Sequence, residues 1–393
     1  MKRINKKIFV LLGLLIALVA FIILSPMLRT SQTARPLSSV GCGAPYHVDG
    51  KRILDAHGNT FVPYGVQLDG ILFAQTNWRT DGALTYLTHD QLLAAHDFWH
   101  SNTVSLQIGS KALFAQAPYD AAYLAALDQT VAWATQLGMN TLLVLQYEGY
   151  GNSAQVLPTQ DTSAAWRVLA SHYKNNAAVF FDLFNEPNPT ALSGGDDTES
   201  IWSLWQHGGT LAGNVYVGLQ QLVDTVRESG AANLVFVDGL ATGEDIALLP
   251  AHLITGKNVV YAIHPYLSAQ HRTESDWDTW FGNAATGNFP VVADEWSEYQ
   301  SDANECFSDA PTIVPRFLAY LRRHEIGLLA YALFPGLLIR GWDFRNPTAF
   351  DEPTYTCRAT PLANFDSRAQ GSGQLLKAYF VGNSVQASTC PKG

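Results

Sequence analysis

The stretch Val179-Phe-Phe-Asp-Leu-Phe-Asn-Glu-Pro-Asn-Pro189 joins a run of apolar and aromatic residues to a carboxylate. The run from Val179 to Phe184 is typical of a buried strand, and Pro187 prevents that strand from continuing. An isolated ionised carboxylate is costly to bury, so Glu186, beside Asn185, is a candidate cleft group. For this segment alone a surface Glu that opens a turn is the simpler interpretation. A functional interpretation therefore requires a partner elsewhere in the chain.

Similar apolar runs recur along the chain and alternate with helix-like stretches, which is typical of an α/β protein with a parallel sheet. After a short hairpin (46–54 and 60–62, with a turn at 55–59), eight strands are predicted: Pro63–Gln67, Thr103–Ile108, Asn140–Leu145, Val179–Asn185, Leu234–Asp238, Val259–His264, Val291–Glu295 and Leu328–Phe334.

The clearest helical periodicity lies between these strands, at Leu92–His100, Tyr123–Leu137, Ala164–Lys174, Val215–Glu228 and Pro311–His324. Eight strand–helix units in roughly 330 residues predict a (β/α)8 TIM barrel with insertions, preceded by the short N-terminal β-hairpin. A doubly wound sheet is the alternative, but no Gly-rich phosphate loop follows the first strand.

In a TIM barrel the catalytic groups lie at the carboxyl ends of the strands. The seventh predicted strand ends in Asp294 and Glu295, on the opposite side of the barrel from Glu186. Because side chains alternate along a strand, we expect Asp294 to point away from Glu295. Asp238, at the end of the fifth strand, is interpreted as structural. Two carboxyls about 5–5.5 Å apart support retaining glycoside hydrolysis, and about 6.5–9.5 Å supports inversion.

Composition narrows the choice of partner. Hydrophobic residues make up 47% and charged residues 15% of the 393 residues, which is enough apolar material for a large core. Residues 36–393 carry 18 basic and 34 acidic side chains, a net charge of −16. We therefore expect a neutral glycan substrate and no nucleic-acid partner. With no HExxH cluster and no G-x-S-x-G elbow, we expect no metal, no cofactor and no serine-hydrolase chemistry. A monomer is expected.

The N-terminus differs from the rest of the chain. Residues 1–35 contain six basic and no acidic residues around the uncharged apolar run Ile8–Leu24. We expect a membrane anchor, with a cleaved signal sequence as the alternative; either one places the remainder outside the cytoplasm. Residues 36–44 are interpreted as a linker and residues 45–393 as the catalytic barrel. In an exported protein the four cysteines predict two disulfides, for which we favour Cys42–Cys390 and Cys306–Cys357.

Several motifs resemble those of glycoside hydrolase family 5, the cellulase-like family of (β/α)8-barrel enzymes. The segment 166–187, WRVLASHYKNNAAVFFDLFNEP, is similar to the family's helix and fourth strand. The segments NVVYAIHPY (258–266) and PVVADEW (290–296) resemble its sixth- and seventh-strand signatures. The opening VDGKRILDAHGNTFVPYGVQLDG (48–70) is similar to its leading hairpin and first strand. The resemblance covers most of residues 46–380.

The resemblance implies a role for each matching residue. Glu186 would be the acid/base and Glu295 the nucleophile of a retaining β-glycosidase. Asn185 would bind the sugar 2-hydroxyl, while His264 and Tyr266 would line the site, with Tyr266 holding the nucleophile. Tyr331 would occupy the place of the family's eighth-strand Trp under the sugar. The position of Trp296 directly after Glu295 also favours the cleft.

Three positions depart from the family's pattern. Ser105 stands where the family places an Arg near the nucleophile, and Gln107 follows two residues later. The third strand ends in Gln146, Tyr147 and Glu148 instead of a His, and the eighth has Tyr331 in place of Trp. Without the Arg, Glu295 loses a cation that keeps it ionised, and Gln107, Gln146 or Tyr147 are the candidates for supplying hydrogen bonds instead.

We therefore predict a retaining hydrolase of β-linked glycans. The alternatives are a non-catalytic carbohydrate-binding barrel and a cell-surface transglycosylase. Four Trp residues in loop-like segments are candidate sugar platforms or loop packing, namely Trp78, Trp277, Trp280 and Trp342.

Overall fold

The computed structural model describes residues 46–68, 87–114, 118–146, 156–193, 198–267, 271–297, 310–334, 337–347, 349 and 373–383. All of them belong to Ser39–Gly393, the second of the two units into which the chain divides. The predicted anchor, the linker and all four cysteines lie outside the described residues, so the membrane, domain-boundary and disulfide predictions stay predictions. Within the described part, no helix combines the length and the hydropathy that a membrane span requires.

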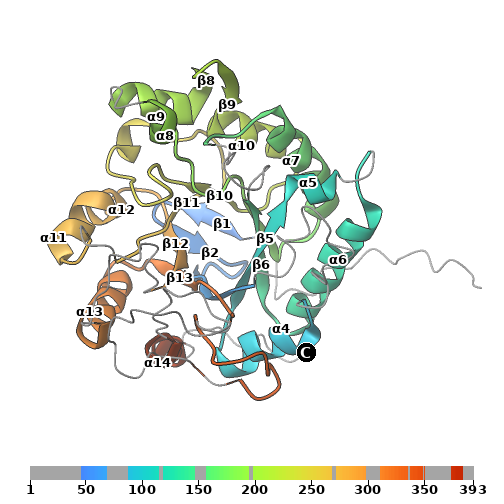
Figure 1. The fold of residues 1–393 in the computed structure, drawn as a ribbon, viewed down its shortest axis with the longest axis vertical. Coiled ribbons are helices and arrows are strands. Elements are labelled where there is room, and N and C mark those ends of the chain that lie inside the picture. The colour runs from blue at the N-terminus through green and yellow to red at the C-terminus, as the bar shows by residue number, and fades with distance from the viewer. Residues whose placement is uncertain are drawn as a thin grey trace, which may run out of the picture. The chain divides into compact units, whose positions relative to one another are not determined.

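Eight parallel strands close into a barrel, which confirms the predicted fold (Figure 1). The circle is completed where the last strand pairs with the first, Leu328 beside Tyr64. The barrel strands are β4 (Tyr64–Leu68), β5 (Thr103–Gly109), β6 (Asn140–Gln146), β7 (Val179–Asp182), β10 (Val235–Asp238), β11 (Val259–Ile263), β12 (Val291–Trp296) and β13 (Gly327–Ala330).

Helices form a ring outside the strands (Figure 1). Local sequence explains where several begin: the Asp120 side chain caps α6, and Thr159 caps α7 with a capping box. The helices are α4 (His89–Leu93), α5 (Ser110–Leu113), α6 (Ala121–Gln136), α7 (Gln160–Tyr173), α8 (Thr190–Ser193), α9 (Thr198–His207), α10 (Leu219–Glu228), α11 (Glu274–Trp277), α12 (Asn283–Ala285), α13 (Ala310–Arg323) and α14 (Gly373–Asn383), with short π or 3-10 turns η2 (Ala94–Phe98), η3 (Leu249–Ala251) and η4 (Asp278–Gly282).

The amino-terminal end of the barrel is closed by apolar side chains. The predicted hairpin is a three-stranded antiparallel sheet of β1 (His47–Asp49), β2 (Arg52–Leu54) and β3 (Thr60–Phe61). Its Ile53 joins a buried cluster with inward-facing barrel residues such as Phe180 and Phe236. Tyr46 and Phe61 pack against the same cluster, with edge contacts to Phe180 at 5.2 and 6.1 Å between ring centroids. Substrate therefore has no access from this end.

One predicted helix is partly wrong. Residues 215–217, assigned to the start of a helix, belong instead to β9 (Asn214–Val217), which pairs with β8 (Gly208–Leu211). The two residues between these strands, Ala212 and Gly213, both have positive φ, 50° and 81°, which is the geometry of a two-residue hairpin turn. Val215 and Val217 are β-branched and suit a strand, so α10 begins only at Leu219.

Candidate active site

Glu186 lies just beyond β7, in a turn held by the neighbouring strands. The strand ends at Asp182, earlier than predicted, and the amide of Asn185 donates to the Leu145 carbonyl at 3.0 Å. Glu186 itself has a φ of 55°, which non-glycine residues rarely adopt, and its amide donates to Asp238 Oδ2 at 2.8 Å. The turn thereby places the Glu186 carboxyl at the mouth of the barrel, with 21% of its side chain exposed.

Glu295 reaches the mouth because β12 contains a bulge. Ala293 pairs with Leu328 and Trp296 pairs with Ala330, so β12 has one more residue than β13 over this interval. A bulge of this kind reverses the alternation of side chains and re-aims a residue. Val292 packs in the barrel interior, yet Trp296, four residues later, packs outside against α13. The extra residue lets Asp294 and Glu295 both approach His264.

The carboxyl group of Glu295 is held by two neutral donors. Tyr266 donates its hydroxyl to Oε1 at 2.8 Å, and Gln107 donates its amide to Oε2 at 3.3 Å. Ser105 is fully buried on the same strand as Gln107, and its hydroxyl has no hydrogen-bond partner. Within the described part of the chain, no Lys or Arg forms an ion pair with Glu295. Gln107 thus supplies a hydrogen bond to Glu295, whereas Ser105, which stands where the family has its Arg, does not.

His264, at the end of β11, connects the two glutamates with the strands beneath them. Its Nδ1 lies 3.2 Å from Glu186 Oε1, and its Nε2 lies 3.5 Å from Asp238 Oδ2 and 3.4 Å from Asp294 Oδ1. Gly243 lies against the ring, and its carbonyl accepts from the backbone amide of His264 at 2.9 Å. Gly243 has a φ of 82°, and a Cβ there would lie 2.8 Å from His264 Cγ, so only glycine fits.

The two glutamates face each other across the mouth. One carboxylate oxygen of Glu186, one of Glu295 and a ring nitrogen of His264 all lie within 4.8 Å of one another. This spacing corresponds to the closer of the two carboxyl arrangements found in glycoside hydrolases.

Burial dominates the electrostatics of the site. It raises the pKa of Glu295 from 4.5 to about 7, with Glu186 adding to the rise and His264 opposing it. Burial alone would lower the pKa of His264, but Asp238, Glu295 and the other carboxyls around it raise that pKa well above 6.5. Burial, followed by the charge of Glu295, raises the pKa of Tyr266 well above 10, so it remains a hydrogen-bond donor. Among the described residues, the surroundings of His264 therefore favour a positive charge on its ring.

Three buried aspartates surround the lower side of His264, and sequence reasoning missed their part in the site. Asp294 was expected to point away but faces the imidazole, and Asp238, which was interpreted as structural, faces it as well. Asp182, on β7, is fully buried beside them. Each lies on a different strand, so only the pairing of these strands reveals the cluster. One ligand atom from each of Asp238, His264 and Asp294 lies within 4.8 Å of the others.

Two buried amides complete the mouth. Asn185 is 3% exposed, and neither its Oδ1 nor its Nδ2 has a partner within the protein. Gln146, at the end of β6, is 7% exposed with an unpaired Oε1. Buried polar atoms normally have a hydrogen-bond partner, so these groups are available to the hydroxyls of a bound ligand.

The aromatic predictions have mixed outcomes. Trp296 is fully buried and stacks on Phe317 at 5.1 Å, so it belongs to the core and the cleft prediction is wrong, because the bulge turns it outward. Trp277 is also core, at 1% exposed. Tyr331 follows β13 and lies close enough to Tyr266 to influence its pKa. Trp280 packs on His271, and Trp342 is 48% exposed, while Trp78, Tyr147 and Glu148 lie outside the described residues.

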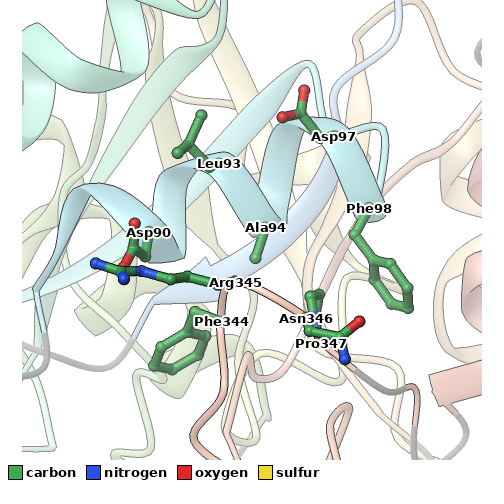
Figure 2. Close-up of a pocket in the computed structure, with 9 residues that line it drawn as sticks. All are labelled: Asp90, Leu93, Ala94, Asp97, Phe98, Phe344, Arg345, Asn346 and Pro347. Carbon is green, nitrogen blue, oxygen red and sulfur yellow. The ribbon is translucent and has the colours of Figure 1, made fainter.

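A separate pocket of about 570 Å³ lies between α4, η2 and the segment 344–347 (Figure 2). Arg345 crosses it to pair with Asp90 at 2.7 Å, and the rings of Phe98 and Phe344 lie on either side. None of its lining residues is one of the predicted site residues. It is therefore distinct from the carboxyl pair.

Comparison with known proteins agrees with this geometry. Residues 54–335 match the Cellulase family, glycosyl hydrolase family 5. An endoglucanase from Paenibacillus polymyxa is 28% identical over 207 residues, which are 49% of this chain and 48% of the relative. The chain thus matches about half the length of this curated relative.

Among solved structures, a β-glucanase from Saccharophagus degradans superimposes with a TM-score of 0.64 at 20% identity, covering 87% of this chain and 94% of the other. The catalytic domain of an endoglucanase from Thermobifida fusca gives a TM-score of 0.57 at 17% identity, covering 86% and 97%. At such identities these likenesses show a shared fold. The sequence match over residues 54–335 shows more: this chain belongs to glycosyl hydrolase family 5.

Proposed function

We propose that the chain is a retaining hydrolase of β-linked glucans, with Glu295 as nucleophile and Glu186 as acid/base. The observation that carries this proposal is the distance across the mouth, where carboxylate oxygens of the two residues lie within 4.8 Å of each other. A pair this close supports double displacement through a covalent intermediate. Family membership supports the reaction class.

In the first step the Glu295 carboxylate attacks the anomeric carbon and forms a C–O bond. The glycosidic bond breaks, its electron pair goes to the leaving oxygen, and that oxygen takes a proton from Glu186. Tyr266 and Gln107 hold the two oxygens of Glu295 and so aim the attacking one.

In the second step a water molecule attacks the same carbon and gives a proton to the Glu186 carboxylate. The bond to Glu295 breaks, and its electron pair returns to the carboxylate. The unpaired amide of Asn185 is placed to bind a sugar hydroxyl during both steps. Such a bond accelerates the reaction if it is stronger in the transition state than in the ground state.

The substrate class follows from charge and from the relatives. The excess of acidic residues favours an uncharged polymer. The similar proteins are an endoglucanase and β-glucanases, one of which was solved with cellotetraose. The basic and apolar N-terminal segment supports an enzyme tethered outside the cytoplasm, where such polymers are found. Removing residues 1–35 should move a monomeric protein from the membrane to the soluble fraction.

The test uses Glu186→Gln and Glu295→Gln with a β-glucan oligosaccharide as substrate. Each variant should lose about 10³-fold or more in kcat, because the amide neither attacks nor exchanges a proton. A 2-fluoro aryl glycoside with a good leaving group should label Glu295 covalently in the wild type, and intact mass should show one adduct. Wild-type rates in both variants would refute the assignment. Product analysis with excess acceptor sugar then separates hydrolysis from transglycosylation.

A further inference from the structure

The mouth rests on a layer of buried acidic groups that the reaction described above does not use. Asp182 and Asp238 are 0% exposed and Asp294 is 2% exposed, each on a different barrel strand. Several of their carboxylate oxygens have no hydrogen-bond partner within the protein, namely Asp182 Oδ2, Asp238 Oδ1 and both oxygens of Asp294. Burying so many acidic groups lowers the stability of the folded state, so each of them calls for an explanation.

Asp238 differs from the other two because it reaches Glu186 by two routes. Its Oδ2 accepts the Glu186 amide at 2.8 Å, which holds a backbone with a φ of 55°. The same oxygen lies 3.5 Å from His264 Nε2, and His264 Nδ1 contacts Glu186 Oε1 at 3.2 Å. One carboxylate therefore contacts the backbone of Glu186 directly and its side chain through the imidazole.

Carboxyl groups from several strands surround the imidazole that connects Asp238 with Glu186. The imidazole faces Glu186 from the turn after β7, Asp238 from β10, and Asp294 and Glu295 from β12. Asp182 lies behind them, and Tyr266 follows on the same segment as His264. Burial raises the pKa of Asp182 and of Asp238 above their usual range, and the neighbouring His264 opposes that rise in both. The acids retain His264 as an imidazolium that donates toward Glu186.

We propose that Asp238 is a positioning residue for Glu186, holding both its strained backbone and, through His264, its carboxyl group at the scissile bond. The inference rests on the proposed acid/base role of Glu186. Asp238 touches no substrate, so its loss weakens only those steps in which Glu186 transfers a proton.

The leaving group provides the test. A dinitrophenolate departs without a proton, whereas a sugar leaving group must be protonated as it departs. The substrates are a dinitrophenyl β-cellobioside and cellotetraose, and the measured quantity is kcat/KM, which reports the first covalent step. Asp238→Ala should lower kcat/KM for cellotetraose by about 10²-fold and for the activated substrate by less than about fivefold. Asp238→Asn, which keeps an acceptor for the Glu186 amide, should fall between Asp238→Ala and the wild type.

Asp182→Asn is the matched control. This aspartate has the same burial and accepts the Phe184 amide at 3.3 Å, which Asn can also do, but it does not contact Glu186. It should lower kcat/KM for both substrates by a similar small factor. Equal losses on both substrates in Asp238→Ala, or the same selective loss in Asp182→Asn, would overturn the inference. Covalent labelling of Glu295 shows that a variant is folded; if Asp238→Ala does not fold, Asp238→Ser replaces it in the same comparison.

A double variant separates this inference from the proposed function. If Asp238 acts through Glu186, adding Asp238→Ala to Glu186→Gln should cost less than about threefold more on cellotetraose. A further loss of about 10²-fold would show an independent role and contradict the proposal. Wild-type activity in Glu186→Gln alone would instead refute the acid/base assignment. If Glu186→Gln lowers kcat/KM for cellotetraose far more than for the activated substrate and Asp238→Ala does not, only the positioning role is refuted.

Discussion

The closed end and the mouth of this barrel are formed by the same eight strands, but their side chains differ in kind. At the closed end, Phe180, Phe236 and Leu329 pack with the N-terminal sheet in an apolar cluster. At the mouth, the same strands continue into carboxyls, amides and an imidazole, most of which are also buried, while Glu186 is 21% exposed. The contrast indicates that the closed end stabilises the fold, while the buried polar groups that catalysis needs at the mouth lower the stability.

The largest effect should come from Glu295→Gln. We expect kcat to fall by about 10⁴-fold, because the variant lacks the nucleophile. The same change should stabilise the protein at high pH. A folded-state pKa of about 7, above the ordinary 4.5, means that the ionised form is disfavoured by folding. This cost is absent below pH 4.5, grows as pH rises and is complete above pH 7.

The gain in the free energy of unfolding should therefore be roughly 3 kcal/mol at pH 8 and near zero at pH 4. Urea unfolding of the wild type and variant at the two pH values measures it. A loss of stability at pH 8 would show that the mouth does not carry the cost described here.

The opposite result is expected at the closed end. Phe180→Ala removes a ring that packs against Tyr46, Phe61 and Phe236. The free energy of unfolding should fall by about 3–5 kcal/mol, whereas kcat of the folded protein should change by less than about threefold. Phe180→Leu should lose less stability and serves as the control. If Phe180→Ala instead lost as much activity as Glu295→Gln and kept its stability, the closed end would not have the purely stabilising role described here.

The pH dependence should report the burial of Glu295. The nucleophile must be ionised, so activity on a dinitrophenyl glycoside should decrease as pH falls below about 7. At pH 5 kcat/KM should be about 100-fold below its plateau. Initial rates between pH 4.5 and 9 measure this limb, and a limb near pH 4.5 would contradict the assigned pKa.

The smallest effect tests the neutral support of the nucleophile. Gln107→Ala removes the 3.3 Å hydrogen bond to Glu295, so kcat/KM should fall by about tenfold and the acidic limb should move to higher pH. Ser105→Ala is the control on the same strand, since its hydroxyl is buried without a partner. It should change kcat/KM by less than about threefold. Equal losses of kcat/KM in the two variants would show that the hydrogen bond from Gln107 to Glu295 does not support the nucleophile.

Much of this contrast could be predicted from sequence. Apolar periodicity indicated the eight strands, and Asn185, Glu186, His264 and Tyr266 follow strand ends, where a barrel places its site. These signals are local, because each depends on a few consecutive residues.

What could not be predicted depends on contacts between distant segments. The bulge in β12 has no sequence signature, yet it decides that Glu295 faces the mouth and Trp296 the core. The aspartate cluster requires β7, β10, β11 and β12 to be neighbours in the barrel, which places the three aspartates around His264. The β8–β9 hairpin was missed because its turn has Ala212 where Asn or Gly is usual.

The central claim is that Glu186 and Glu295 act as a retaining pair. The most direct measurement is proton NMR of the first product released from a β-linked oligosaccharide, recorded before mutarotation. The account predicts that the new reducing end appears first as the β-anomer, because two displacements restore the configuration. An initial α-anomer would contradict it and would require a water molecule between the two carboxyls.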